Sequence, residues 1–423
     1  MKNFFSKLGV VLKDTTMRKR IGFTILALVL FRLLSTIPIP GIDFSSLQRL
    51  LAGNQFFGLL DIFSGGGISR LSIVMLGVGP YITASIIMQL LTMMFPKMKA
   101  MMQEEGEAGR AKLSQYSRLI SIPLAALQAF GFLALLQNQN VLPHLTGIGL
   151  IVNIIVITAG STLLMWIGEL ISEFGIGNGV SLIIFAGIVA VLPTNIIQFI
   201  AGFDPNQIPF YLLFIVIAVI VILGVVVVTE AERSVPVTYA KQVRGNKVYG
   251  GVSTYLPLRL NQAGVIPIIF ALSILLFPQI VFNFLSNSSN ITIADISASI
   301  SSFLNSAIPY AVMYFILVFI FTYFYTAITF DPKQISENLQ KGGAFIPGVR
   351  PGDPTMEYLG KIVTRITLVG ALFLGIIAVL PLCIQAFTGT RTLAIGGTAL
   401  LIVVSVVLDL LKKVDAQIAM REY

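Results

Sequence analysis

The sequence predicts an all-α integral membrane protein of ten transmembrane helices, arranged as two halves of five. Three observations predict this class. The 423 residues are 56% hydrophobic and only 11% charged, whereas soluble domains carry about 25% charged residues. Ten apolar segments have the length that a bilayer requires. Lysine and arginine gather in alternate links between those segments, as the positive-inside rule expects.

The chain divides into a basic amphipathic lead (1–20), an N-terminal half (21–200), a C-terminal half (201–411) and a tail (412–423). Five spans in each half give the second half the opposite orientation. This is the parity of inverted-topology repeats, which place a pathway at their interface. The halves share no convincing sequence identity, so the repeat is inferred from the number of spans in each half alone. The predicted spans are 21–37, 71–95, 114–136, 149–171, 179–199, 209–229, 258–283, 307–329, 361–382 and 391–411.

The basic residues set the topology. All but four of the 28 Lys and Arg lie in the lead, the tail, or the links 96–118, 230–259 and 331–365. This asymmetry places those segments and both chain ends in the cytoplasm. One link breaks the pattern, because 172–178 should be cytoplasmic and carries neither Lys nor Arg. The four exceptions are Arg32, Arg49, Arg70 and Arg391.

A short apolar piece, Phe56 to Ser64, precedes the triple glycine Gly65 to Gly67. A run this short does not span a bilayer, and glycines let the chain turn sharply. Lipid cannot satisfy irregular backbone, so a half-helix must be covered by protein or line a water-filled cavity. The stretch from 53 to 67 therefore predicts a re-entrant half-helix that sits in a pore.

Ionisable groups are scarce inside the spans and lie near span ends, at Arg32, Glu169 and Asp409. The simplest interpretation is that they reach the membrane surface. No carboxylate lies near a membrane centre, which argues against ion-coupled pumping. One cysteine and one histidine argue against a metal site built from His and Cys. Because phosphate-binding and hydrolase motifs are also missing from the sequence, we expect no enzyme and no cofactor.

Two cytoplasmic links are longer than a connection between two membrane spans requires. The first, 230–257, is rich in Val, Tyr and Thr and bends at residues 244–246, which predicts a β-hairpin with a basic tip. The second, 331–360, is punctuated by Pro and Gly and presents Arg350 between turn residues. Each link is either a plain topology determinant or a docking surface for RNA phosphates or an acidic protein patch.

Several stretches, in order over nearly the whole chain, resemble the SecY family, the channel subunits of bacterial protein translocases. The resemblance implies an hourglass pore between the two inverted halves. The stretches are FRLLSTIPIPGID (31–43), FSGGGISRLSI (63–73), PYITASIIMQLL (80–91), EEGEAGRAKLSQYSR (104–118), GIGNGVSLIIFAGIVA (175–190), STYLPLRLNQAGVIPIIF (253–270), GGAFIPGVRPGDPT (342–355), RITLVGALFL (365–374) and GGTALLIVV (396–404).

The resemblance also implies a ring of aliphatic side chains that seals the pore, and a plug formed by the half-helix. Taken singly, each ring residue would be interpreted as helix packing, and only the motif placement assigns it a role. The ring falls on Val78, Ile82, Val180, Ile184, Ile269 and Ile402, and the plug on Phe56, Phe57, Leu59, Leu60, Ile62, Phe63 and Ser64.

The second and seventh helices correspond to the family's lateral gate. Gln89 and Asn261 are polar residues of these helices, and we expect them to hydrogen-bond across the interface and tune opening. The alternative is that each faces the headgroups. The hairpin tip, with Lys241, Arg244 and Lys247, corresponds together with Arg350 to docking sites for the SecA motor ATPase and the ribosome.

The partners and location follow from the same resemblance. It implies SecE-type and SecG-type small membrane subunits, and a bacterial plasma membrane with both termini cytoplasmic. The predicted function is a passive channel that translocates unfolded preproteins bearing signal sequences and releases apolar segments sideways into membrane lipid. The residues alone leave a secondary transporter of a small solute open, because such carriers share the inverted parity and the broken helix.

Overall fold

The computed structural model describes residues 14–39, 64, 66–68, 70–138, 142, 147–201, 208–240, 242–244, 247–249, 253–285, 290–388 and 391–419. Ten of the described helices overlap the ten predicted spans, one for one. In the first half they are α2 (Thr15–Leu34), α5 (Gly79–Met94), α7 (Gly106–Asn138), α8 (Gly147–Phe174) and α9 (Gly179–Ala201). In the second half they are α10 (Ile208–Glu230), α11 (Ile266–Leu285), α13 (Ala307–Thr329), α15 (Asp353–Thr388) and α16 (Arg391–Ala419). The mostly helical architecture that the sequence predicts is confirmed.

Length and hydropathy of the described helices are those of a membrane protein. Four stretches are long and apolar enough to cross a bilayer, and further apolar helices are shorter, such as Gly79–Met94 and Gly179–Thr194. The four stretches are Gly106–Gln137, Gly147–Phe174, Ile308–Lys341 and Asp353–Leu380.

Two predicted span limits are wrong. The span predicted from 71 begins as a helix only at Gly79, because 70–78 form successive turns in which Leu71 and Gly77 have φ of 41° and 57°. The span predicted from 258 begins only at Ile266, because the preceding residues belong to a strand and a turn in which Gly264 has φ of 62°. Apolar composition marks residues that avoid water, and the turns at 71–78 are as apolar as the helix that follows them.

The two halves repeat the same helix contacts. In the first half α5 packs on α7 and α8, α7 on α8, α8 on α9, and α2 on α9 and α8. In the second half α11 packs on α13 and α15, α13 on α15, α15 on α16, and α10 on α16. Gly224 of α10 also faces Phe373 of α15, which matches the contact of α2 with α8. The contact pattern therefore supports the internal repeat that the span count predicts.

The halves meet along two seams. On one side α9 contacts α16, and on the other α11 contacts α5 and α7. The largest hydrophobic cluster draws buried side chains from both halves, among them Ile82 of α5, Ile184 of α9 and Ile402 of α16. The main core thus lies between the halves as well as within them.

Polar and close backbone contacts fix α8 to its neighbours. Ser161 Oγ donates a hydrogen bond of 2.9 Å to the carbonyl of Gly77, just before α5. A Cβ atom added at Gly179 would lie 1.8 Å from the carbonyl oxygen of Gly168, so only glycine allows the observed approach of α9 to α8. These contacts hold α5, α8 and α9 at fixed spacing around the core.

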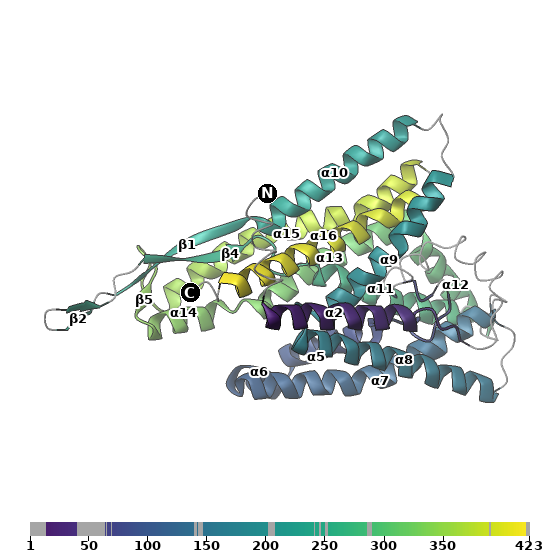
Figure 1. Cartoon of the computed structure of the whole chain (residues 1–423), viewed down its shortest axis with the longest axis horizontal. Helices are drawn as coiled ribbons and strands as arrows, with labels where there is room; N and C mark the ends of the chain where they lie inside the picture. The colour runs from purple at the N-terminus through teal and green to yellow at the C-terminus, as the bar shows by residue number, and fades with distance from the viewer. Residues whose placement is uncertain are drawn as a thin grey trace.

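A small antiparallel sheet extends from one end of the helix bundle, and α12 (Ile291–Asn305) lies at the other end (Figure 1). The strand order of the sheet is β4 (Ser253–Arg259), β1 (Glu232–Tyr239), β5 (Ala344–Phe345). Beyond it, β2 (Gln242–Arg244) pairs antiparallel with β3 (Lys247–Tyr249), so the chain reverses direction between these two strands. The predicted hairpin is confirmed.

The sheet is anchored to the helices by its own apolar cluster. Val235 and Val237 of β1 and Leu258 of β4 pack with Leu359 and Ile362 of α15. Near this cluster, α14 (Pro332–Lys341) begins at Asp331, whose side chain accepts hydrogen bonds from the first backbone amides of the helix. A further short helix, α6 (Pro96–Glu104), connects α5 to α7. The long links that sequence reasoning singled out are therefore folded structures on the bundle.

Candidate functional site

A cavity of about 550 Å³ lies between the two halves. One wall comes from the first half and is mostly polar. The facing wall comes from α11 and α13 of the second half and presents Ile266, Ile269, Phe270 and Tyr325. The first-half wall is formed by Tyr81, Ile82, Ser85, Gln89, Ser114, Arg118, Glu169, Ser172, Glu173, Asn178, Val180, Ser181 and Ile184.

The six residues assigned to the ring lie together. Four of them, Ile82, Val180, Ile184 and Ile269, line the cavity. Five belong to the main hydrophobic cluster, and Val180 packs against it. Val78 and Ile402 are each only 1% exposed. Residues from α5, α9, α11 and α16 thus converge on one apolar cluster beside the cavity.

Two pairs of ring residues owe their position to helical spacing. Val78 precedes the first turn of α5, and its carbonyl accepts a hydrogen bond of 3.1 Å from the amide of Ile82. Val180 and Ile184 lie four residues apart on α9. Residues at this spacing share a helix face, so each pair presents two branched side chains to the same region.

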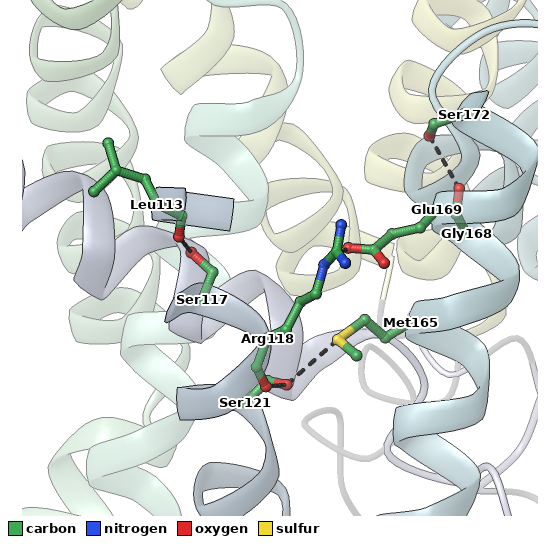
Figure 2. A network of polar contacts seen from close by, with 8 residues as sticks. All are labelled: Leu113, Ser117, Arg118, Ser121, Met165, Gly168, Glu169 and Ser172. Carbon is green, nitrogen blue, oxygen red and sulfur yellow. Dashed lines mark hydrogen bonds and ion pairs between the residues drawn. The ribbon is translucent and has the colours of Figure 1, made fainter. Parts of the chain in front are cut away.

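The polar wall carries an ion pair that joins two helices. The Nε atom of Arg118 on α7 lies 2.5 Å from Oε1 of Glu169 on α8, and the side chains point toward one another in Figure 2. Nearby, Ser121 Oγ lies 2.7 Å from the Arg118 carbonyl and 3.4 Å from the sulfur of Met165. Ser172 Oγ donates to the carbonyl of Gly168 on α8.

Sequence reasoning placed Glu169 near a span end and did not pair it with Arg118. A signal was present, because Arg118 and Glu169 lie close to the predicted ends of two consecutive spans, on the side of the membrane that the topology gives to both. Opposite charges at the same depth on neighbouring antiparallel helices can meet. Asp409 forms an ordinary exposed pair with Lys413, one turn along α16, at 3.1 Å.

The two amides predicted to lie at the gate, Gln89 and Asn261, have different surroundings. Gln89 is on α5 as predicted and lines the cavity, and its buried Oε1 has no hydrogen-bond partner among the described residues. Asn261 is not on the seventh helix, because it precedes α11. Its Nδ2 donates a hydrogen bond of 3.1 Å to the carbonyl of Gly264, within the same turn. The predicted hydrogen bond across the helix interface is therefore wrong for Asn261 in this structure.

Most predicted plug residues, namely Phe56, Phe57, Leu59, Leu60, Ile62 and Phe63, lie outside the described residues. The last one, Ser64, is buried and accepts hydrogen bonds from the amides of Gly67 and Ile68, at 3.0 and 3.1 Å. Gly66 has φ of 80°. The turn that the triple glycine predicts is thus present where the structure describes it.

Of the predicted docking residues, Arg244, Lys247 and Arg350 lie at the end of the molecule that carries the sheet (Figure 1). Lys241 lies outside the described residues. Arg244 of β2 lies opposite Lys247 of β3 in the strand register. Arg350 is exposed between β5 and α15. Its carbonyl accepts a hydrogen bond of 2.8 Å from Thr355 Oγ1, which orders this loop against the start of α15.

Among the described residues, no group of three or more His, Cys, Asp or Glu side chains could hold a metal ion. The single cysteine, Cys383, is exposed.

Comparisons with known proteins agree over nearly the full length. A family profile described as SecY matches residues 72–411. The chain is 42% identical over 433 residues to a protein translocase subunit SecY of Thermus thermophilus, an alignment that covers 100% of this chain and 97% of that protein. A SecY subunit of Corynebacterium glutamicum is 41% identical, with 97% of each chain covered.

Solved structures show the same fold. One described as "The structure of a protein conducting channel" has a TM-score of 0.66 at 22% identity, covering 96% of this chain and 93% of the other. Sec61 in a canine ribosome–channel complex from the endoplasmic reticulum has a TM-score of 0.60 at 21% identity, with the same coverage. Both likenesses concern the arrangement of helices.

Proposed function

Because this chain belongs to the SecY family, we propose that it forms the protein-conducting channel of a translocase. The matched relatives are protein translocase subunits over almost their whole length, which supports this role over the solute carrier that the residues alone left open. The observation that carries the proposal is the cavity between the two halves, with four ring residues in its lining. The chain is a passive pore and no enzyme.

The six aliphatic ring residues form the seal. Branched aliphatic side chains offer ions nothing that replaces their hydration shell, and an apolar constriction excludes ions by dewetting. Such side chains can also repack around polypeptides of any sequence, because the contacts involved are non-directional. Val78 and Val180 are shorter than isoleucine and leave the seal slightly wider. The plug residues 56–64 cover the pore at rest.

The seam between α5 and α11 is the lateral gate. These helices contact each other, and Gln89 beside this seam has a buried carbonyl oxygen without a hydrogen-bond partner in the described part of the chain. An unsatisfied buried polar atom costs about 1–3 kcal/mol, so this atom favours separation of the helices. A signal sequence enters there, favoured by burial of apolar surface at about 25 cal/mol per Å². Its entry displaces the plug.

The gate assignment is tested by replacing the amides singly. Gln89→Leu removes the unsatisfied oxygen and should raise the requirement for a functional signal sequence, measured as export of precursors with weakened signals. Asn261→Leu serves as the comparison, because Asn261 lies in the turn before α11 and bonds within it. Unchanged export of the weak-signal precursors by Gln89→Leu would remove Gln89 from the gate.

The sheet and the loop around Arg350 form the docking face for the energy source. Arg244, Lys247 and the exposed Arg350 supply positive charge for RNA phosphates of a ribosome or for acidic groups of a SecA-type motor. SecE-type and SecG-type subunits pack on the outer helices. The protein resides in a bacterial plasma membrane, and both termini are cytoplasmic.

Reversing the charge at Arg350 tests the docking face. Arg350→Glu should abolish motor-driven export while leaving the thermal unfolding midpoint unchanged, since the side chain is exposed. Normal export by this variant would refute the assignment.

A site-specific crosslink tests the pathway itself. A photo-reactive side chain at Ile184 should crosslink to a stalled secretory precursor, and the crosslink should require the precursor's signal sequence. The control position is Ile148 on α8, which is 79% exposed and outside the cavity lining. If a docked precursor gave no crosslink at Ile184, Ile82 or Ile269, the pathway would lie elsewhere.

A further inference from the structure

The cavity contains charge on one wall only. Of the described residues that line it, Arg118 is the single basic one, and Glu169 and Glu173 are the acidic ones. Arg118 and Glu169 form a contact of 2.5 Å, with side chains 45% and 21% exposed. Glu173 is exposed one turn further along α8, where water and salt screen its charge. The facing wall of Ile266, Ile269 and Phe270 supplies no charge.

The position of the ion pair distinguishes it from a pair whose only role is to hold α7 against α8. The helices α7 and α8 are in contact over much of their length, and an ion pair between them could lie on any side. It lies on the side that faces the cavity, because both Arg118 and Glu169 are among the residues that line it. Because both partners keep some exposure to the cavity, their charges act on whatever occupies it.

We propose that the Arg118–Glu169 pair determines how readily basic and acidic polypeptide segments pass through the cavity. Each partner cancels the field of the other, so the polar wall stays hydrated and carries little net charge beside a translocating segment. Basic and acidic segments then cross the cavity with similar ease. This inference rests on the proposed function, and it assigns both residues as specificity-determining residues for the polypeptide substrate.

Removing one partner should bias the channel by the sign of the charge that remains. In Glu169→Gln the unpaired Arg118 repels basic segments, and in Arg118→Gln the unpaired Glu169 repels acidic ones. Coulomb's law with the dielectric of a hydrated cavity gives about a two- to threefold slower passage for each unit charge that passes ~10 Å away. The double variant Arg118→Gln with Glu169→Gln carries neither charge and should not discriminate.

The test measures translocation into vesicles that contain the full chain with its partner subunits and motor. Three precursors differ only in one stretch, which is basic, acidic or neutral. The expected result is a selective slowing of the basic precursor by Glu169→Gln and of the acidic precursor by Arg118→Gln, both weakened by added salt. The control is Glu105→Gln, which removes an equivalent pair with Lys112 (2.8 Å) outside the cavity lining and should slow no precursor selectively.

Equal slowing of all three precursors by either single variant would overturn the inference, because that result describes a pair that only holds α7 to α8. Unchanged rates would overturn it as well. A second measurement needs no variant: a channel held open by a stalled precursor should pass K⁺ and Cl⁻ at similar rates, and strong selectivity for either ion would contradict a nearly neutral wall. Failure of the neutral precursor to enter wild-type vesicles would instead count against the proposed function.

Discussion

Replacing Gly179 by alanine should separate α8 from α9 and destabilise the protein. The added Cβ would lie 1.8 Å from the carbonyl oxygen of Gly168 and 2.8 Å from Cβ of Ile171. Both neighbours are fixed parts of α8, so neither can rotate away. An ordinary contact needs about 3.4 Å, and α9 must therefore shift by ~1.5 Å. That shift also breaks the hydrogen bond of 2.9 Å from the Gly179 amide to Ser172 Oγ.

The magnitude follows from these two losses. Overpacking of a well-packed interior costs about 1–3 kcal/mol, and a lost hydrogen bond costs about 1 kcal/mol more. We therefore expect Gly179→Ala to lower the free energy of unfolding by about 2–4 kcal/mol. The thermal midpoint of the purified protein in detergent should fall by about 2–5 °C, because the entropy of unfolding grows with chain length. Because Val180 and Ile184 follow on α9, the seal should loosen too.

The matched control is Gly22→Ala on α2, where an added Cβ meets no atom of the other described residues within 4 Å, the backbone of its own helix turn aside. Alanine is favoured over glycine in a helix by about 1 kcal/mol, so this control should keep or raise the midpoint. Equal midpoints for Gly179→Ala and Gly22→Ala would refute the reasoning, because they would mean that α8 and α9 are not in close backbone contact.

Three further predictions follow from single contacts. Ser161→Ala removes the buried hydrogen bond to the Gly77 carbonyl and should lower the unfolding free energy by about 1–3 kcal/mol, measured as a smaller fall in midpoint than that of Gly179→Ala. Asp331→Ala removes the N-cap of α14, worth about 1 kcal/mol, and should speed amide hydrogen exchange in α14 selectively; uniform exchange would contradict it. Ile184→Ser places a hydroxyl in the ring and should raise ion conductance of the resting channel in planar bilayers, whereas an unchanged conductance would remove Ile184 from the seal.

The sequence predicted the parts of the fold that depend on composition. Apolar length located all ten helices, and the Val-rich, Tyr-rich link with a central Gly-Asn predicted the hairpin of β1 to β4. It missed the helix starts at Gly79 and Ile266, because apolar length does not mark the residue at which a helix begins. The turns at 71–78 are as apolar as α5. Asn261 was misplaced because it falls in the turn between β4 and α11.

The candidate site was predictable only in part. Helical spacing links Val78 to Ile82 and Val180 to Ile184, but nothing in a single sequence brings Ile402 to the same cluster. That step came from resemblance to a family, and the structure places these residues together. The pair of Arg118 and Glu169 was missed because residues 51 positions apart meet only through the packing of α7 on α8.

Five of the six proposed ring residues belong to the main hydrophobic core and the sixth packs against it, and this has a thermodynamic consequence for the resting state. On the proposed assignment, opening the pathway exposes six aliphatic side chains at about 1.5–3 kcal/mol each, on the order of 10 kcal/mol together. At about 1.4 kcal/mol per factor of ten, unaided opening would occupy roughly one molecule in ten million. Closure of the channel is therefore driven by the same burial of apolar side chains that drives folding. A ligand that opens the channel must supply enough binding free energy to offset the exposure of these side chains.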